Sequence, residues 1–263
     1  MAILSVVVLT YNSEGLIRGC LESAKWADEI IIVDSMSQDK TVDICKEYTD
    51  KIWQRPWPGY AKQWNFAIDQ AKGDWIFILA SDEEITPQLQ SEIEQVLTDG
   101  TDSFQGYNVP RKAYFLRQWI RGAGWYPGYS IRLIRNGSGH FDDKAVHEAL
   151  QLSGKAGSLK GDILHFSYES IDQYISRLNR YTDLEVLDML ENPLSLSRTK
   201  VVARALFRPI KVFFKKYLKQ GGVRDGMHGF LLSVFSSYYV FMTYAKYWEA
   251  LKRLHGRKAT DRV

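Results

Sequence analysis

The chain has 263 residues, 45% of them hydrophobic and 25% charged, which is typical of a globular protein that buries a core. A net charge of +3 excludes a global nucleic-acid signature, although eight Lys and Arg and no acid lie within Arg198–Lys219. The sequence contains no run of 18 strictly apolar residues, so a conventional membrane span is not indicated. Cys20 and Cys45 fall in helical patterns, and with no secretory signal at the N-terminus we expect both to be buried thiols in a reducing cytosol.

Buried strands alternate with amphipathic helices over the first 100 residues. The predicted strands are Ile3–Leu9, Glu29–Val33, Lys51–Gln54 and Trp75–Leu79. Between and after them, apolar residues recur at helical spacing over 16–24, 42–48, 60–71 and 87–97. This alternation predicts right-handed βαβ units around a parallel sheet.

Polar clusters follow three of these strands, at Thr10–Glu14, Asp34–Asp39 and Ala80–Glu84. Because ligands bind at the carboxyl ends of strands in open α/β sheets, we expect the clusters to converge on one rim. Carboxylates there suit a hard divalent cation and hence a phosphorylated ligand. The alternative for the last cluster is a solvated acidic turn before a helix. No GxGxxG or GxxxxGK[ST] loop is present, so neither a dinucleotide fold nor a P-loop NTPase is supported.

Short strands of mixed orientation are predicted beyond residue 100, at Gln105–Val109, Tyr114–Leu116 and Ser130–Arg135. Aromatic residues set among glycines lie between them, within Trp119–Tyr129. Such a segment suits stacking on a sugar ring, and simple loop packing is the alternative. A helix is predicted from about Ser170 to Leu190.

The last part of the chain is basic and amphipathic. Apolar and cationic residues alternate over Ser197–Lys219, with a kink expected at Pro209, and Gly221 and Gly222 interrupt the pattern before the apolar segment Phe230–Ala245. A cationic, aromatic amphipathic pair favours an interfacial membrane anchor. A helical hairpin packed on the rest of the protein, or a dimer contact, is the alternative.

Several motifs together resemble family 2 glycosyltransferases with the GT-A fold. In this sequence they read LTYNSE at 9–14, EIIIVDS at 29–35, KQWNFA at 62–67, DE at 82–83, GWYP at 124–127, IRL at 131–133, VHE at 146–148 and HFSY at 165–168. With the basic tail, the chain resembles the branch that includes lipopolysaccharide-core β-glucosyltransferases. The resemblance covers nearly the whole chain.

The resemblance implies a Rossmann-like nucleotide-diphospho-sugar transferase fold, in which helices flank a mixed α/β sheet. It implies a catalytic domain over residues 1–190, with a nucleotide-sugar half at 1–100 and an acceptor half at 101–190. Residues 191–263 would then form a helical, amphipathic, membrane-associating extension.

The resemblance also implies a set of donor and metal ligands. Asp82 and His165 would hold Mg²⁺ or Mn²⁺, although a structural role for His165 is the alternative. Asp34 would contact the base, and Lys62 and Asn65 would lie near the diphosphate. The full set implied for the nucleotide-sugar is Thr10, Tyr11, Asn12, Glu14, Asp34, Lys62, Asn65, Ser81 and Asp82.

Two positions depart from the family pattern. The usual Asp-x-Asp motif reads Ala80-Ser81-Asp82 here, so the first acid is missing, and Glu84 is a candidate to compensate for it. Because the second acid is the usual direct ligand, we expect metal binding to survive in weakened form. Trp64 replaces a residue that is often basic, which leaves Lys62 for the phosphate contact.

An inverting transfer needs a carboxylate to deprotonate the attacking hydroxyl, and the resemblance makes Glu148 the candidate base. A surface acid is the alternative for Glu148. The residues implied for the acceptor are Trp125, Tyr126, Arg132 and His147.

The sequence therefore predicts an inverting, metal-dependent glycosyltransferase that uses a UDP- or GDP-linked sugar. The expected acceptor is a lipid-linked or lipopolysaccharide-core saccharide. We expect the protein to be cytoplasmic and peripheral on the inner face of the cell membrane, in contact with anionic lipid and with no nucleic-acid partner. The alternatives are a nucleotidyltransferase on a similar sheet and an inactive membrane-associated scaffold of the same fold.

Overall fold

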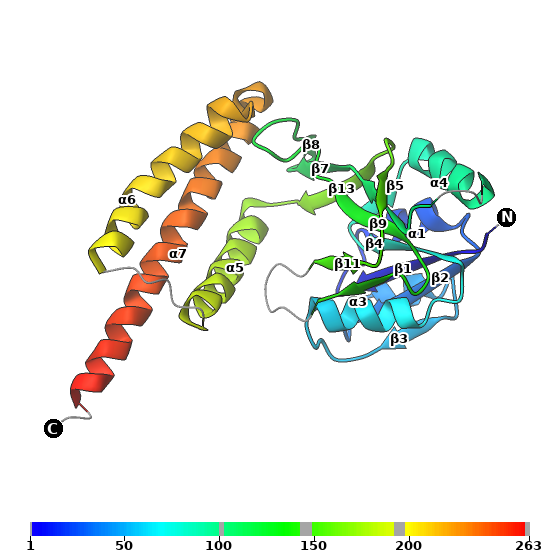
Figure 1. Ribbon diagram of the computed structural model, residues 1–263, viewed down its shortest axis with the longest axis horizontal. Helices are drawn as coiled ribbons and strands as arrows, with labels where there is room; N and C mark the ends of the chain where they lie inside the picture. The colour runs from blue at the N-terminus through cyan, green and yellow to red at the C-terminus, as the bar shows by residue number, and fades with distance from the viewer. Residues whose placement is uncertain (1, 100–102, 143–148, 192–197, 261–263) are drawn as a thin grey trace. The chain divides into compact units, whose positions relative to one another are not determined.

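The computed structural model describes residues 2–99, 103–142, 149–191 and 198–260 (Figure 1). The chain forms two compact units. The first, which we call the sheet unit, comprises Met1–Ala113 and Pro127–Ser167. The second, the helical unit, comprises Tyr114–Tyr126 and Tyr168–Val263.

Within the described residues, the sheet unit is built on a seven-stranded mixed sheet of order β12-β6-β9-β4-β1-β2-β3. The strand β1 (Leu4–Thr10) runs parallel to β2 (Glu29–Asp34) on one side and to β4 (Trp75–Ala80) on the other. All of β1 is buried, which explains its continuous apolar sequence. The remaining strands are β3 (Ile52–Gln54), β6 (Gly106–Val109), β9 (Ser130–Arg135) and β12 (Ala156–Ser158).

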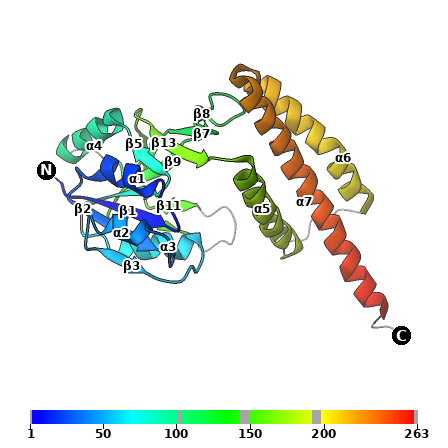
Figure 2. The same cartoon turned by 180° about the vertical axis from the view of Figure 1, so that it is seen from behind.

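Helices cover both faces of this sheet, because alternate residues of a strand point to opposite sides. Val6 packs in a cluster with α1 (Ile17–Ala24) and α4 (Pro87–Asp99). Val7, the next residue along β1, packs with α3 (Tyr60–Asp69) instead (Figure 2). The parallel strands are therefore held from both sides, and their carboxyl ends are fixed relative to one another.

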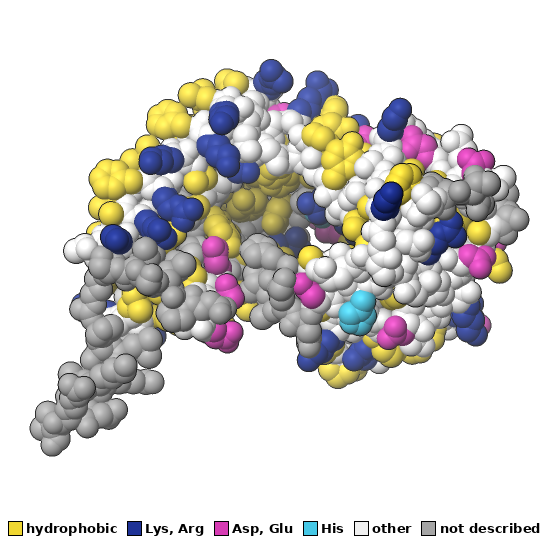
Figure 3. Space-filling view, viewed as in Figure 1, with side chains coloured by type: hydrophobic (Ala, Val, Ile, Leu, Met, Phe, Trp, Pro, Cys, Tyr) yellow, Lys and Arg dark blue, Asp and Glu magenta, His cyan; other side chains and the backbone are white. Residues whose placement is uncertain are grey.

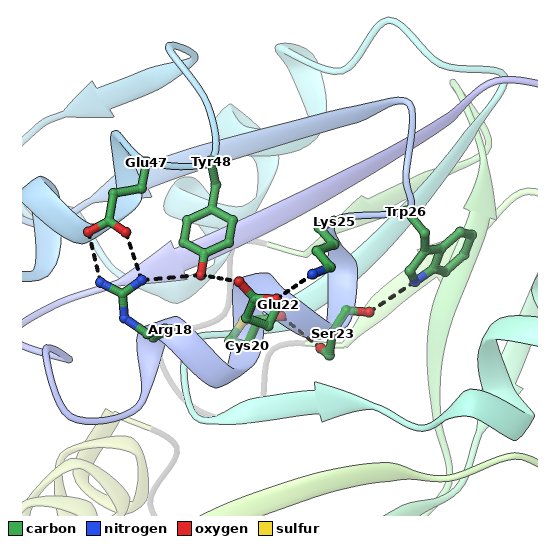
Figure 4. A network of polar contacts seen from close by, with 8 residues as sticks. All are labelled: Arg18, Cys20, Glu22, Ser23, Lys25, Trp26, Glu47 and Tyr48. Carbon is green, nitrogen blue, oxygen red and sulfur yellow. Dashed lines mark hydrogen bonds and ion pairs between the residues drawn. The ribbon is translucent and has the colours of Figure 1, made fainter.

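A polar network ties α1 to the segment after α2 (Thr41–Cys45) (Figure 4). Arg18 donates two hydrogen bonds of 2.7 Å to the Glu47 carboxylate, and the Tyr48 hydroxyl donates one of 2.6 Å to Glu22. The hydrogen bond from Arg18 lowers the pKa of Glu47. The predicted helix was too long at this point: α2 ends before Tyr48, whose hydroxyl instead reaches across to α1.

A second pairing in the sheet unit joins β5 (Glu83–Ile85) to β13 (Ile163–Tyr168). The two strands are antiparallel, and His165 lies opposite Glu83. The backbone N–H of Phe166 donates a 2.9 Å hydrogen bond to the carbonyl of Asp82. Glu83 and Glu84 are therefore part of a strand pair, and Ser81 and Asp82 form the turn that precedes it. A further antiparallel pair consists of β10 (Gly139–Phe141) and β11 (Leu150–Leu152).

The helical unit consists mainly of α5 (Ile171–Glu191), α6 (Arg198–Phe214) and α7 (Gly226–Thr260). Val201 of α6 and Val186 of α5 pack together with Tyr244 and Tyr247 of α7. The helix α6 continues through Pro209 into a π-turn, η1 (Lys215–Lys219), and a 3₁₀ turn, η2 (Gly222–Asp225), precedes α7. At the start of this unit, Tyr114 and Phe115, the last two residues of β7 (Arg111–Phe115), pair with β8 (Gln118–Trp119).

The predicted fold class is confirmed: helices flank a mixed α/β sheet, as expected for the GT-A fold, and helices follow at the C-terminal end. In the part of the chain that the structure describes, no helix has both the length and the apolar character that crossing a bilayer requires. The functional division at residue 190 stays a prediction.

Candidate functional site

The carboxyl ends of the parallel strands form one rim, as the sequence predicted. In the strand register, Thr10 at the end of β1 lies opposite Asp34 at the end of β2. On the other side of β1, Leu9 lies opposite Ala80, the last residue of β4. The three polar clusters therefore begin at the same level of the sheet.

The loops after β1 and β2 are bonded to each other. The backbone N–H of Asn12 donates a 2.8 Å hydrogen bond to the Ser37 hydroxyl, and the Asn12 side-chain oxygen accepts one of 2.8 Å from the N–H of Gln38. Glu14 accepts a 3.0 Å bond from the N–H of Lys40. Asn12 has a φ of 45°, which this exchange of bonds holds in place. Tyr11, which precedes Asn12 in the same loop, is exposed.

Asp34 is fully buried at the rim and its carboxylate organises the second loop. It accepts a 2.9 Å bond from the N–H of Ser37, a short bond from the Ser37 hydroxyl and a 3.1 Å bond from Gln54. These bonds orient the loop, and the predicted contact of Asp34 with a base stays a prediction.

Two buried oxygen atoms at the rim lack partners among the described residues. They are the Thr10 hydroxyl oxygen and the side-chain oxygen Oε1 of Gln63, whose amide nitrogen donates to Ser35 at 3.1 Å. Both residues are at most 3% exposed. Since buried polar atoms nearly always have a partner, these two atoms favour a polar ligand or water at the rim.

Asp82 and His165 meet beyond the end of β4. The Asp82 carboxylate oxygen Oδ2 and the His165 nitrogen Nε2 are 3.3 Å apart. The other ring nitrogen, Nδ1, lies 2.9 Å from the hydroxyl of Ser167, which is buried. A hydroxyl that donates to Nδ1 would leave the hydrogen on Nε2, whereas one that accepts would leave Nε2 free as a ligand.

The pair fits a divalent cation. Two ligands at right angles on an ion with bonds of about 2.1 Å lie about 3.0 Å apart, close to the separation seen here. Carboxylate oxygen and imidazole nitrogen both suit Mn²⁺, and the carboxylate suits Mg²⁺. Among the described residues, no cluster of three or more His, Cys, Asp or Glu side chains could hold a metal ion. A cation bound here would therefore need further ligands, which diphosphate oxygens can supply.

The side chain of Glu83 has different partners from that of Asp82. Its carboxylate accepts a 2.6 Å bond from Arg132 and a 2.9 Å bond from the backbone N–H of Ala80. Arg132 also donates a 3.3 Å bond to the carbonyl of Ile78. Both side chains of this ion pair are largely buried, with 1% of Glu83 and 12% of Arg132 exposed. The pair fixes the end of β4, where the first acid of the usual motif is absent.

Glu84 does not lie beside the missing acid. Its carboxylate packs against the backbone of Gly19 in α1, so closely that a Cβ on that residue would lie 2.2 Å from a carboxylate oxygen. Burial there raises the pKa of Glu84. The proposed compensation by Glu84 therefore has no support in this arrangement. Ser81 is placed at the rim instead, with its hydroxyl 2.9 Å from that of Ser13.

The predicted diphosphate contacts both lie on α3. Lys62 is exposed. Asn65 uses its amide to hold β10: it donates a 3.0 Å bond to the carbonyl of Phe141 and accepts one of 2.8 Å from the N–H of the same residue. Its neighbour Trp64 stacks on the Phe141 ring. Asn65 thus has a structural partner, and its predicted contact with the diphosphate stays a prediction.

A cavity of about 420 Å³ lies beside the buried ion pair. Trp64, Ile78, Arg132 and Phe141 are among the residues that line it. A larger cavity of about 570 Å³ includes Asn136, just after β9. Since β9 is antiparallel to β4, that cavity lies toward the opposite end of the sheet from the rim.

The remaining predicted residues fall into two groups. Trp125 packs at the edge of Phe115 in the helical unit, and Tyr126 packs at the edge of Trp119. His147 and Glu148 lie in 143–148, outside the residues that the structure describes.

Sequence reasoning missed three contributors to the site. Gln63 sits within a quoted motif, but helical spacing gave no sign that its amide would be buried beside Ser35. Ser167 follows His165 by two positions in a strand, and that period-2 spacing is a signal that could have paired them. The Arg132–Glu83 pair joins residues 49 positions apart and had no local signal.

Comparison with known proteins identifies the family of this chain. The model of glycosyl transferase family 2 matches residues 5–152, and the chain belongs to that family. The chain is 30% identical to the lipopolysaccharide core biosynthesis glycosyltransferase LpsC of Rhizobium meliloti, over 99% of this chain and 96% of that protein. The predicted resemblance is therefore confirmed.

A second relative and one solved structure are also similar to this chain. An uncharacterized glycosyltransferase, RT0209 of Rickettsia typhi, is 27% identical over 98% of this chain and 91% of that protein. A crystal structure of S. aureus TarS in complex with UDP-GlcNAc superimposes with a TM-score of 0.45 and 16% identity, over 95% of this chain and 92% of that one.

Proposed function

We propose that this family 2 glycosyltransferase moves a hexose from a nucleotide-sugar to a saccharide hydroxyl, with inversion at the anomeric carbon and dependence on Mg²⁺ or Mn²⁺. The observation that carries the proposal is the Asp82–His165 pair, whose 3.3 Å separation at the rim suits two ligands of one cation. The partnerless oxygens of Thr10 and Gln63 support a polar ligand at the same rim.

In the proposed donor complex, the loops after β1 and β2 hold the nucleoside. Tyr11 lies in the loop after β1, and its exposed ring is proposed to stack on the base. Thr10, Asn12, Glu14 and Asp34 contribute polar groups around base and ribose. Ser81, Lys62 and Asn65 are proposed on the diphosphate side, together with the cation held by Asp82 and His165.

The proposed reaction is a single displacement. The acceptor hydroxyl gives its proton to the Glu148 carboxylate as its oxygen attacks the anomeric carbon. The bond from that carbon to the diphosphate oxygen breaks, and the nucleoside diphosphate leaves with the electron pair. The cation, when bound, stabilises the negative charge that develops on the diphosphate. Lys62 adds a positive charge on the same side.

The proposed acceptor is a lipid-linked or lipopolysaccharide-core saccharide at the cytoplasmic face of the membrane. Similarity to LpsC, a lipopolysaccharide core biosynthesis glycosyltransferase, supports this choice. Arg132 and Arg111 both line the 420 Å³ cavity, which has room for a sugar. Trp125, Tyr126 and His147 are proposed as further acceptor contacts.

The test is release of UDP or GDP from a panel of nucleotide-sugars with Mn²⁺, measured for wild type and three variants. We expect Asp82→Asn and Glu148→Gln each to lower turnover on the order of 100-fold. Glu47→Gln, which removes an exposed carboxylate on another part of the sheet unit, should leave turnover unchanged. Unchanged turnover in both site variants would refute the assignment.

The same experiment separates the alternatives. A nucleotidyltransferase would release pyrophosphate from a nucleoside triphosphate and a sugar phosphate, and it would release no diphosphate from a nucleotide-sugar. An inactive scaffold would turn over none of these donors.

A further inference from the structure

One side of α6, of the turns after it and of the first turn of α7 is apolar and exposed. We call this surface the outer face. Its members are between 42% and 66% exposed, and they are Val202, Leu206, Phe207, Ile210, Phe214, Leu218, Val223 and Met227. Large apolar side chains seldom gather in one exposed strip on a soluble protein without a partner.

The opposite side of α6 explains why the outer face stays uncovered. Val201 is fully buried against α7, and the carbonyl of Pro209 accepts a 2.8 Å hydrogen bond from Ser237 of α7. Arg208 also reaches α7, where it bonds the hydroxyl of Tyr244. One side of α6 is thus packed against α7, and the exposed apolar residues of the outer face lie on the other side.

Basic residues run along one flank of the outer face. Arg204, Lys211 and Lys215 recur at spacings of seven and four, which places them in a row along α6 and into η1. Lys219 and Arg224 continue the positive charge and are exposed. Figure 3 shows Lys and Arg beside yellow side chains over α6. No Asp or Glu occurs from Arg198 to Lys219.

We propose that the outer face is a docking surface for an anionic lipid bilayer, on which α6 lies in the plane of the interface. A helix of 17 residues is about 26 Å long and presents its apolar side chains to the acyl boundary while the row of cations meets the headgroups. A second copy of this chain fits less well, because a symmetric contact would oppose two rows of like charge with no acid between them.

Residues 121–126, part of the aromatic and glycine-rich segment, lie beside the turns that end the proposed docking helix. The loop is fixed to the turns after α6: Asp225 accepts bonds of 3.0 and 2.7 Å from the N–H groups of Arg121 and Gly122, and Lys216 donates one of 2.9 Å to the carbonyl of Ala123. If the proposed function holds, this docking presents Trp125 and Tyr126 near a lipid-linked acceptor.

The test is binding of the full chain to vesicles, followed by sedimentation. Wild type should bind vesicles containing phosphatidylglycerol and bind pure phosphatidylcholine at least about tenfold more weakly. Phe207→Glu should weaken binding to the anionic vesicles by about tenfold or more, because it replaces an exposed apolar side chain by a negative charge that the anionic lipid repels. The matched control is Leu187→Glu, at an exposed position of α5, which should bind within about twofold of wild type.

Equal binding of wild type and Phe207→Glu would overturn the proposal. So would a wild-type dimer that Phe207→Glu converts to monomer without any vesicle binding, since the outer face would then be a self-association surface. Release of nucleoside diphosphate in the absence of vesicles should be the same in Phe207→Glu as in wild type. Vesicle binding without turnover of any donor would support the docking surface and refute the proposed function.

Discussion

The buried Arg132–Glu83 pair makes a strong prediction about the stability of the sheet unit. Replacing Arg132 by Met leaves the Glu83 carboxylate, 1% exposed, with the backbone N–H of Ala80 as its remaining hydrogen-bond donor among the described residues. Removing one member of a buried pair costs about 3–5 kcal/mol, and we expect about 3 kcal/mol here because that backbone bond survives. With a urea m-value of about 2 kcal/mol per molar, the unfolding midpoint should fall by about 1.5 M.

The assay is equilibrium urea unfolding followed by circular dichroism, for Arg132→Met, Glu83→Gln and the double variant. The double variant should recover at least about 1 kcal/mol relative to the sum of the single losses, because it leaves no unpaired charge. Arg18→Met is the matched control, since it breaks an Arg–Glu pair that is half exposed and should change the midpoint little. A loss in Arg132→Met no larger than in this control, or additive losses in the double variant, would refute the reasoning.

Two further predictions concern titratable groups. Burial raises the pKa of the Glu29 carboxyl, but hydrogen bonds from Lys51, the N–H of Lys72 and Ser5 outweigh it and lower the pKa overall. The ionised Glu29 carboxylate therefore stabilises the fold above the unfolded pKa of about 4.3, and this stabilisation is lost as pH falls through the folded pKa. The difference in melting temperature between wild type and Glu29→Gln should narrow from pH 7 to pH 3. A difference that stays constant would contradict this. Burial and then the charge of Asp34 raise the pKa of Cys45 to about 12, and burial raises that of Cys20, so neither thiol should react with Ellman's reagent at pH 8 before unfolding. Rapid native labelling of either thiol would show that it is not buried.

The sheet could be predicted from the sequence because its strands carry a strong local signal. The apolar runs in β1, β2 and β4 are long enough to be recognised alone, and the polar residues that follow each run indicate the shared rim. The strand β5 could not be predicted, since its sequence EEI carries two acids in three residues. It forms because β13, about 80 positions later, supplies the hydrogen bonds. Pairing over that distance has no trace in local composition.

Residues of the candidate site could be selected from the sequence more readily than the contacts between them. The family resemblance assigned Asp82 and His165 to one metal site, and the structure brings their side chains to 3.3 Å, while their role as ligands stays a prediction. The direction of Glu84 could not be predicted, because three adjacent acids look alike until packing separates them. Asp82 faces His165, Glu83 pairs with Arg132, and Glu84 packs on α1. A strand edge distributes neighbouring side chains to different sides, and partners far along the chain decide what each one meets.

We propose above that Asp82 and His165 hold a cation that binds the donor diphosphate. This can be measured by calorimetric titration of UDP into wild type and Asp82→Asn, with Mn²⁺ and with EDTA. We expect Mn²⁺ to strengthen UDP binding to wild type by at least about tenfold, since two charge-assisted contacts are gained. Asp82→Asn should lose this gain and should bind UDP like wild type in EDTA. An equal gain from Mn²⁺ in both proteins would show that Asp82 does not hold the cation.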